Sequence, residues 1–327
     1  MEALSEIADQ QGAARRALPT LCGPESLPPP YDVLPVRLRD GEIVTARRHG
    51  NPAGPRLFVS HGNGLAADLY FPFWRHFLTD YDVVLYDLRN HGWNAVGEWD
   101  RHHFAAFVFD NESVLEAVGK RWGPRPALGA FHSLSALVAL YQVLRAGPRW
   151  AGLVLFDPPI TPPLGHRLEP AFRAGQIAIS ERAARRSESY PDYEAFASVL
   201  GHARGFSHLS APVRRLIARA TLRPWDAPAP GVVLRCPREL EARVYVANLD
   251  STIELAMPGF PCPLEVIGAD PSAPAGGAPS RICESLLPAW GVEYESVAGT
   301  THFLQLEKPV ECARLAREFF RRCGLGP

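Results

Sequence analysis

The strongest constraint on the fold of this 327-residue chain is the alternation of short apolar segments with longer segments of helical periodicity. Several of the short segments are apolar almost throughout, as expected of parallel strands that are covered on both faces. A predicted hairpin precedes them, because the turn dipeptide Asp40–Gly41 joins the segments 33–39 and 42–48. The later predicted strands are 57–60, 83–86, 127–131, 153–156, 264–267 and 294–297. This pattern predicts an α/β fold with a mostly parallel sheet flanked by helices.

The alternation is interrupted between residues 158 and 244, after the sixth predicted strand. This region is rich in Arg, Pro and Ala and has possible helices at 169–186, 193–203 and 212–222. It contains no convincing buried strand, so it is interpreted as a largely helical insertion over the end of the sheet. The predicted organisation is an N-terminal extension at 1–30, a core at 31–157 and 245–327, and a helical cap (lid) at 158–244. Residues 270–280 have the composition of a loop.

Composition and charge narrow the class of protein. With 46% hydrophobic and 21% charged residues, the chain is not intrinsically disordered, and its net charge of −1 gives no reason to expect a nucleic-acid partner. The longest apolar runs are too short to span a bilayer. The acidic N-terminus lacks the form of a signal peptide, and the six cysteines form no CxxC pair. We therefore expect a cytoplasmic protein with free thiols and no membrane span; its oligomeric state is left open.

One serine occupies a position suited to chemistry. In the segment ALGAFHSLSA, residues 127–136, an apolar strand ends at Ser133 and a helical pattern begins directly after it. A serine on such a sharp turn projects its hydroxyl at the carboxyl edge of the sheet, where α/β proteins bind ligands. The alternative interpretation is a helix N-cap serine. Ser135 is a second candidate, but it falls inside the first helical turn.

At this segment the chain resembles the α/β-hydrolase family, in its branch with a serine nucleophile. The resemblance covers roughly residues 31–157 and 245–323 and does not inform the insertion. Further matching segments occur in the family's order: SHGNG at 60–64, YDLRNHG at 86–92, IGAD at 267–270 and GTTHF at 299–303. The first corresponds to the family's oxyanion loop and the last to its histidine loop.

The resemblance implies a role for each matching residue. Ser133 would be the nucleophile, His302 the base that takes its proton, and Asp270 the acid that orients the imidazole. The backbone N–H groups of Asn63 and Leu134 would bind the oxyanion. Asp157 also ends a predicted strand and is the alternative acid.

Two features depart from the family or suggest other chemistry. The usual nucleophile motif is G-x-S-x-G, but Phe131 and Ser135 replace its two glycines, so either the turn is widened or the phenyl ring packs outward. Four histidines, His61, His91, His102 and His103, suggest a metal site, but no HExxH or comparable spacing is present. No metal and no cofactor are expected, because serine chemistry needs neither.

The implied function is a serine hydrolase that cleaves a carboxylic ester, thioester or lactone through an acyl-enzyme. The apolar content of the insertion suggests a small-molecule substrate with an apolar acyl or alkyl portion. The alternative is a non-catalytic protein that binds a small molecule on the same fold, an interpretation motivated by the irregular turn around Ser133.

Overall fold

A computed structural model describes residues 27–203, 205–225, 230–250, 260–273 and 277–327. Most of the predicted N-terminal extension, residues 1–26, therefore lies outside the described residues. All eight strands that the sequence predicts are present, each within two residues of its predicted bounds. They are β1 (Asp32–Arg37), β2 (Ile43–Gly50), β3 (Arg56–Ser60), β4 (Asp82–Tyr86), β5 (Ala127–His132), β6 (Gly152–Phe156), β10 (Leu264–Gly268) and β11 (Glu293–Ser296).

These strands form one eight-stranded sheet in the order β1-β2-β4-β3-β5-β6-β10-β11. β2 runs antiparallel to β1 and β4, whereas every neighbouring pair from β4 to β11 is parallel. The predicted α/β class with a mostly parallel sheet is thus confirmed. Because the parallel strands share a direction, the loops that follow β3, β5, β6 and β10 meet at one edge of the sheet.

The two faces of the sheet bury two separate apolar clusters, which explains why its strands are apolar almost throughout. Within β6, Leu153 and Leu155 belong to one cluster, and Val154 and Phe156 belong to the other. This alternation follows directly from the two-residue period of a strand.

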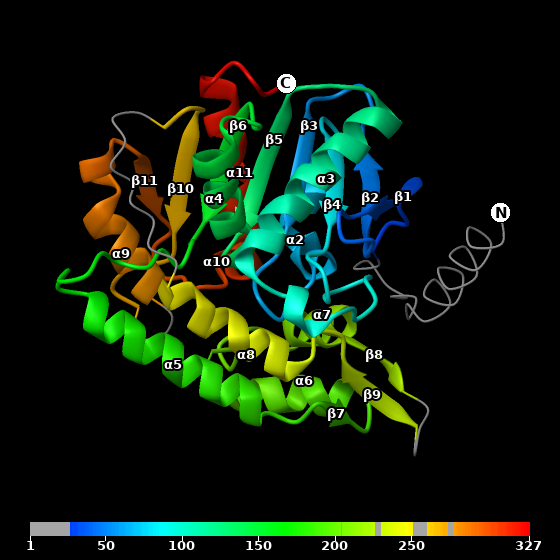
Figure 1. The fold of residues 1–327 in the computed structure, drawn as a ribbon, viewed down its shortest axis with the longest axis vertical. Helices are drawn as coiled ribbons and strands as arrows, with labels where there is room; N and C mark the ends of the chain where they lie inside the picture. The colour runs from blue at the N-terminus through cyan, green and yellow to red at the C-terminus, as the bar shows by residue number, and fades with distance from the viewer. Residues whose placement is uncertain (1–26, 204, 226–229, 251–259, 274–276) are drawn as a thin grey trace.

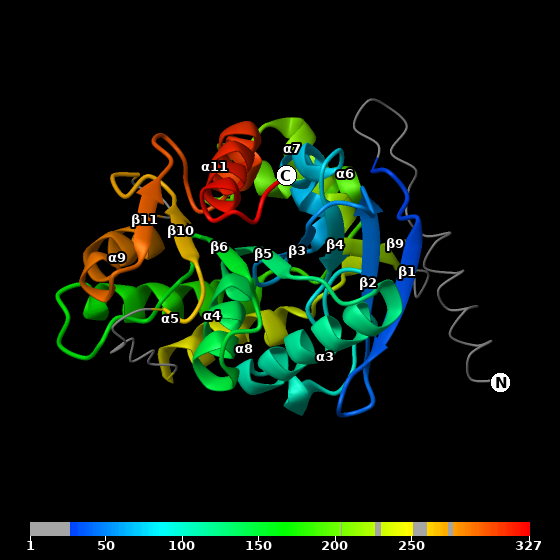
Figure 2. The ribbon, with the colours of Figure 1, turned by 90° about the horizontal axis from the view of Figure 1, so that it is seen from above.

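Helices cover both faces. α3, α4 and α9 contribute to the first apolar cluster, whereas α2 and α11 contribute to the second. Figure 2 shows α3 and α4 on one side of the sheet and α11 on the other. The bounds are α2 (Phe71–Trp74), α3 (Phe104–Trp122), α4 (Leu134–Ala146), α9 (Ala278–Leu286), α10 (Leu304–Glu307) and α11 (Pro309–Arg322). Short 3₁₀ turns are η1 (Ala67–Tyr70), η2 (Arg75–Phe77), η3 (Trp99–Arg101), η4 (Asn248–Asp250) and η5 (Pro288–Trp290). The predicted loop at 270–280 is too long, because α9 begins at Ala278.

The segment between β6 and β10 lies along the lower edge of the sheet in Figure 1. Its helices are α5 (Glu169–Arg185), α6 (Tyr193–His202), α7 (Ala211–Thr221) and α8 (Arg238–Ala247), of which the first three match the predicted ones. The segment also contains a small antiparallel sheet that was not predicted, β7-β9-β8, formed by β7 (Ser189–Tyr190), β8 (Leu222–Trp225) and β9 (Gly231–Leu234). These strands are only two to four residues long, and none of them is buried along its whole length as the central strands of the main sheet are.

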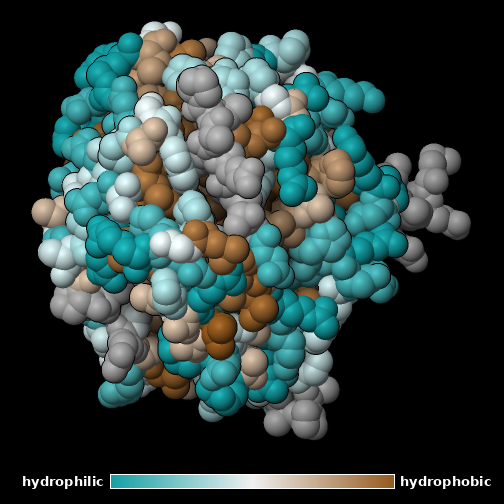
Figure 3. All heavy atoms as spheres, turned by 60° about the vertical axis from the view of Figure 1, so that its left-hand side comes forward, coloured by the Kyte–Doolittle hydropathy of each residue, from teal (hydrophilic) through white to brown (hydrophobic). Residues whose placement is uncertain are grey.

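On the face seen in Figure 3, most of the coloured surface is hydrophilic, and apolar side chains gather in a band. Exposed apolar residues of the segment between β6 and β10 include Leu164, Ile177, Val199 and Val246. Among the described residues, no helix combines the length and the apolar character needed to cross a membrane.

Candidate active site

Ser133 sits on a strained turn between β5 and α4. Its backbone has φ 52° and ψ −112°, a left-handed conformation that residues other than glycine rarely adopt. Its N–H donates to the carbonyl oxygen of Phe156 at 2.9 Å, and its own carbonyl accepts from the N–H of Leu137 at 3.0 Å. These bonds hold the turn in place. Ser133 is largely buried, with 8% of the residue exposed.

The residues that replace the usual glycines fit this turn without opening it. Phe131 points into the core, where its ring packs edge-on against Trp150, with the ring centroids 5.1 Å apart. Gly129 creates the space, because a Cβ at that position would overlap the Phe131 ring. Ser135 does not face the site: its hydroxyl accepts from the N–H of His132 at 3.1 Å and donates to the His132 carbonyl at 3.0 Å.

A hydrogen-bonded chain of three side chains meets at this turn. The Nε2 atom of His302 lies 2.9 Å from the Oγ atom of Ser133, and its Nδ1 atom lies 2.6 Å from Oδ2 of Asp157. Asp157 is fully buried at the end of β6, where its other oxygen accepts from the hydroxyl of Ser280 at 2.7 Å. This is the geometry of a nucleophile, a base and an orienting acid.

Asp270, the predicted acid, hydrogen-bonds elsewhere, and the alternative acid, Asp157, is the carboxylate that binds His302. Phe156 pairs with Ile267 in the sheet, so Asp157 lies level with Gly268, and Asp270 is two residues farther along the chain. Asp270 instead accepts from the N–H and hydroxyl of Ser272 and from the N–H of Gly299. The Ser272 hydroxyl and these N–H groups hold the pKa of Asp270 below its ordinary value.

The loop after β3 passes close to the serine. A Cβ on Gly62 would lie 3.2 Å from the Cβ of Ser133, and the Ser135 N–H donates to the carbonyl of His61 at 3.3 Å. Asn63 directly follows Gly62 and Leu134 directly follows Ser133; these are the two residues predicted to bind an oxyanion. Among the described residues, neither of these two N–H groups donates a hydrogen bond.

Two buried histidines hold the loop after β3 in place through hydrogen bonds. His61 binds the N–H of Leu88 through Nε2 and the carbonyl of Gly62 through Nδ1, whereas His91 accepts from the N–H of Gly64 at 3.1 Å. Burial lowers the pKa of both imidazoles, that of His91 far below its ordinary value, so both rings stay neutral and able to accept. His91 also stacks on His102. Within the described residues, no group of three or more His, Cys, Asp and Glu side chains is arranged to hold a metal ion.

The helix α8 contacts the same loop. The side-chain amide of Asn63 donates to the carbonyl of Glu241 at 2.8 Å, and a Cβ on Gly64 would lie 2.5 Å from the carboxyl carbon of Glu241. Glu241 forms an ion pair with Arg186, beyond the end of α5. Glycine at 64 is therefore required twice, by this contact and by its φ of 70°.

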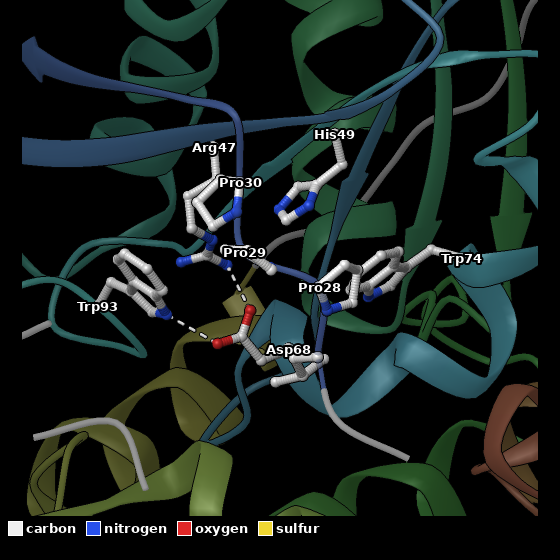
Figure 4. Close-up of a pocket in the computed structure, with 9 residues that line it drawn as sticks. Pro28, Pro29, Pro30, Arg47, His49, Asp68, Trp74 and Trp93 are labelled. Atoms are coloured by element: carbon white, nitrogen blue, oxygen red, sulfur yellow. Dashed lines mark hydrogen bonds and ion pairs between the residues drawn. The ribbon is translucent and has the colours of Figure 1, made fainter. Parts of the chain in front are cut away.

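A cavity of about 410 Å³ lies beside the β2 side of this edge (Figure 4). Its walls include Trp74, Trp93, Arg47 and the proline run 28–30, and no member of the hydrogen-bonded triad lines it. Arg47 ion-pairs with Asp68 at the cavity and with Asp87, at 2.5 Å, behind it. The cavity is thus structurally linked to the segment after β4 but separate from Ser133.

Tyr70 and His132 had no predicted role, yet both side chains lie among the site loops. The phenol oxygen of Tyr70 is 2.6 Å from Nδ1 of His132, and Nε2 of His132 is 2.8 Å from the carbonyl oxygen of His302. The only signal in the sequence was a histidine at the end of an otherwise apolar strand.

Comparison with known proteins agrees with the fold. A model described as the alpha/beta hydrolase family matches residues 57–315. No curated protein sequence matches the chain. Among solved structures, E-2-(acetamidomethylene)succinate hydrolase aligns with a TM-score of 0.69 at 17% identity, covering 89% of this chain and 99% of the other.

Two further solved structures have similar folds. A thioesterase domain from the curacin biosynthetic pathway aligns with a TM-score of 0.64 at 16% identity, covering 87% of this chain and 98% of the other. A thermophilic esterase from Thermogutta terrifontis aligns with a TM-score of 0.61 at 16% identity, covering 89% of this chain and 99% of the other. At such identities these likenesses establish the fold and leave the substrate open.

Proposed function

This chain belongs to the alpha/beta hydrolase family, and from that premise we propose that it is a serine hydrolase that cleaves a carboxylic ester through an acyl-enzyme at Ser133. The observation that carries the proposal is the continuous hydrogen-bonded chain from Ser133 through His302 to the buried Asp157. A serine hydroxyl is a weak nucleophile until an adjacent base takes its proton, and this chain supplies that base.

In the proposed mechanism, the Oγ atom of Ser133 attacks the ester carbonyl carbon while Nε2 of His302 takes the hydroxyl proton. Asp157 accepts from Nδ1–H and stabilises the imidazolium that forms. His302 then gives its proton to the departing alcohol as the tetrahedral intermediate collapses to the acyl-enzyme. Water, deprotonated by the same imidazole, hydrolyses the acyl-enzyme and regenerates Ser133.

The oxyanion of each tetrahedral intermediate would be bound by the backbone N–H groups of Asn63 and Leu134. Support comes from their place beside Ser133 and from the absence of other acceptors for them among the described residues. One such donor typically lowers the barrier by about 3 kcal/mol. The α4 helix begins at Leu134, so its N-terminal partial positive charge acts in the same direction.

We propose a small-molecule substrate with an apolar acyl or alkyl portion. Two partly exposed rings, Phe206 and Phe303, pack together with centroids 4.7 Å apart, and the Phe303 ring lies 5.8 Å from that of His302. They offer an apolar surface beside the reacting atoms. Thioesters and lactones share the same electrophilic carbonyl and belong to the same proposal.

The cap at 158–244 and a cytoplasmic location remain parts of the proposal. The contact of Glu241 with the loop at Gly64 supports a cap that roofs the site. The location is supported by the cysteines of the described residues, which are all unpaired thiols, because thiols persist in reducing compartments. They are Cys236, Cys262, Cys283, Cys312 and Cys323.

Covalent labelling tests the proposed nucleophile. A fluorophosphonate probe should label the folded protein once, at Ser133, and Ser133→Ala should abolish both labelling and turnover of short p-nitrophenyl esters. The matched control is Ser113→Ala on α3, which removes a hydroxyl outside the site. If folded protein stays unlabelled while a known serine esterase reacts, the chain is a non-catalytic binding protein on this fold.

A further inference from the structure

A second hydrogen-bonded chain runs behind the triad and contains no triad side chain. The N–H of Gly62 donates to the phenol oxygen of Tyr70 at 3.3 Å. The same phenol lies 2.6 Å from Nδ1 of His132, whose Nε2 lies 2.8 Å from the carbonyl oxygen of His302. We call these three bonds the Tyr70–His132 relay.

The carbonyl oxygen of His302, at one end of the relay, determines the direction of every bond in it. A carbonyl oxygen only accepts, so Nε2 of His132 carries a hydrogen and donates to His302. In the neutral ring Nδ1 is then an acceptor, and the Tyr70 hydroxyl must donate to it. The Tyr70 oxygen is left free to accept from Gly62. The partners thus fix one tautomer of His132 and one direction for the Tyr70 hydroxyl.

Both side chains of the relay are uncharged. Tyr70 and His132 are essentially inaccessible to solvent. Burial raises the pKa of Tyr70 and lowers that of His132 well below its ordinary value. The centroids of the His132 and His302 rings lie 4.7 Å apart. Because His132 is neutral, it does not oppose a positive charge on His302 at this short distance.

The relay connects three segments that are far apart in the sequence. Gly62 belongs to the loop proposed to bind the oxyanion, His132 directly precedes Ser133, and His302 belongs to the histidine loop. A buried hydrogen-bonding group is costly to leave without a partner, and Tyr70 and His132 are both buried, so these bonds restrict the relative positions of the three segments.

We propose that Tyr70 and His132 are positioning residues that hold the oxyanion loop, the nucleophile turn and the histidine loop in reactive register. This inference rests on the proposed hydrolase function and extends it to residues outside the triad. Neither side chain touches the substrate; each acts through the backbone that it binds.

The first test removes one oxygen atom. Tyr70→Phe keeps the ring but deletes the bonds to Gly62 and His132, so kcat for a p-nitrophenyl ester should fall about tenfold to a hundredfold. KM should change by less than about twofold, because substrate contacts stay in place. The rate of fluorophosphonate labelling should fall in parallel with kcat.

The matched control is Tyr86→Phe. Tyr86 is equally buried, and its hydroxyl donates to Asn111 at 2.7 Å, outside the relay. Both variants lose one buried hydrogen-bonding hydroxyl and should lose similar stability, but Tyr86→Phe should keep its kcat. Equal losses of kcat in the two variants, or an unchanged kcat in Tyr70→Phe, would overturn the proposal.

Rescue at His132 separates positioning from packing. The amide of His132→Gln can still accept from Tyr70 and donate to the His302 carbonyl, whereas His132→Leu can do neither. We expect His132→Gln to retain more kcat than His132→Leu at comparable melting temperatures. Equal activity in the two variants would contradict the relay.

A readout independent of turnover keeps the two proposals distinguishable. Amide hydrogen exchange in residues 61–64 and 299–303 should be faster in Tyr70→Phe than in wild type and unchanged in Tyr86→Phe. If wild type neither reacts nor turns over but this exchange pattern is found, the hydrolase function fails and the relay stands as a structural device. If exchange in Tyr70→Phe is unchanged, the relay fails.

Discussion

At the scale of single residues, position at the edge of the sheet decides what each carboxylate can do. Asp157 and Asp270 both follow buried strands of the same sheet, but only Asp157 is adjacent to its strand end and buried beneath His302. Asp270 lies in the turn beyond, where hydrogen bonds from Ser272 and Gly299 use both of its oxygens. The same kind of side chain hydrogen-bonds an imidazole in one place and closes a turn in the other.

Exchanging each carboxylate for an amide tests this assignment. Asp157→Asn should lower kcat about a thousandfold or more, because an amide stabilises neither the required tautomer nor the imidazolium of His302. Asp270→Asn should keep kcat near that of wild type. The measurement is steady-state hydrolysis of a p-nitrophenyl ester, with circular dichroism to verify folding. The opposite ranking would return the acid to Asp270.

At the scale of elements, β5 accommodates a bulky side chain, Phe131, close to the tight turn at Ser133. Phe131 occupies a position where related motifs have glycine, and its ring packs over Gly129 on the same face of the strand. The Phe131 ring thus fills the space left by the missing side chain of Gly129, two residues earlier in the strand. The Ser135 hydroxyl accepts a hydrogen bond from the His132 N–H within the turn. The tight turn around Ser133 therefore forms without a glycine at either flanking position.

Two glycine-to-alanine substitutions should have opposite effects on stability. Gly129→Ala places a methyl group against Phe131 and within 2.6 Å of Leu153, so it should destabilise the fold by about 1–3 kcal/mol. Gly119→Ala, in α3 with no neighbour within 4 Å, should stabilise it by up to about 1 kcal/mol. Urea unfolding measures both. A neutral or stabilising Gly129→Ala would contradict the packing described for Phe131.

At the scale of the whole molecule, several histidines are buried as neutral rings. Burial lowers the pKa of His49 and His102 to about 3, and it also lowers the pKa values of His61, His91 and His132. In the unfolded chain such imidazoles titrate near 6.5. The unfolded state therefore binds more protons than the folded state throughout the interval between these values.

This difference predicts loss of stability in mild acid. Above pH 6.5 the neutral His49 and His102 make their full contribution to the free energy of unfolding, and this contribution is lost as the pH falls toward 3. Each histidine lowers the free energy of unfolding by up to about 1.4 kcal/mol per pH unit in that interval. Urea unfolding at pH 7.0, 6.0 and 5.5 measures the slope before most carboxylates titrate. His49→Gln should make the slope shallower; a stability independent of pH over this range would contradict the prediction.

Much of the fold was predictable from local pattern. Buried parallel strands must be apolar on both faces, and this requirement marks the segments of β3 to β10 in the sequence. Ser133 was singled out by its turn between a strand and a helix, and His302 by the resemblance of its loop to the histidine loop of the family. Tyr70 was not predictable, since nothing in a short 3₁₀ turn indicates a partner 62 residues away.

The choice between Asp157 and Asp270 shows where sequence patterns stop being sufficient. Both aspartates satisfy every local rule, and they differ only in where strand register places them relative to His302, which contacts Asp157 across 145 residues of chain. The burial of Phe131 over Gly129 and the relay from Gly62 to His302 are likewise matters of register and packing. Secondary structure follows from neighbours along the chain, whereas a catalytic geometry depends on distances between segments, and those exist once the sheet has assembled.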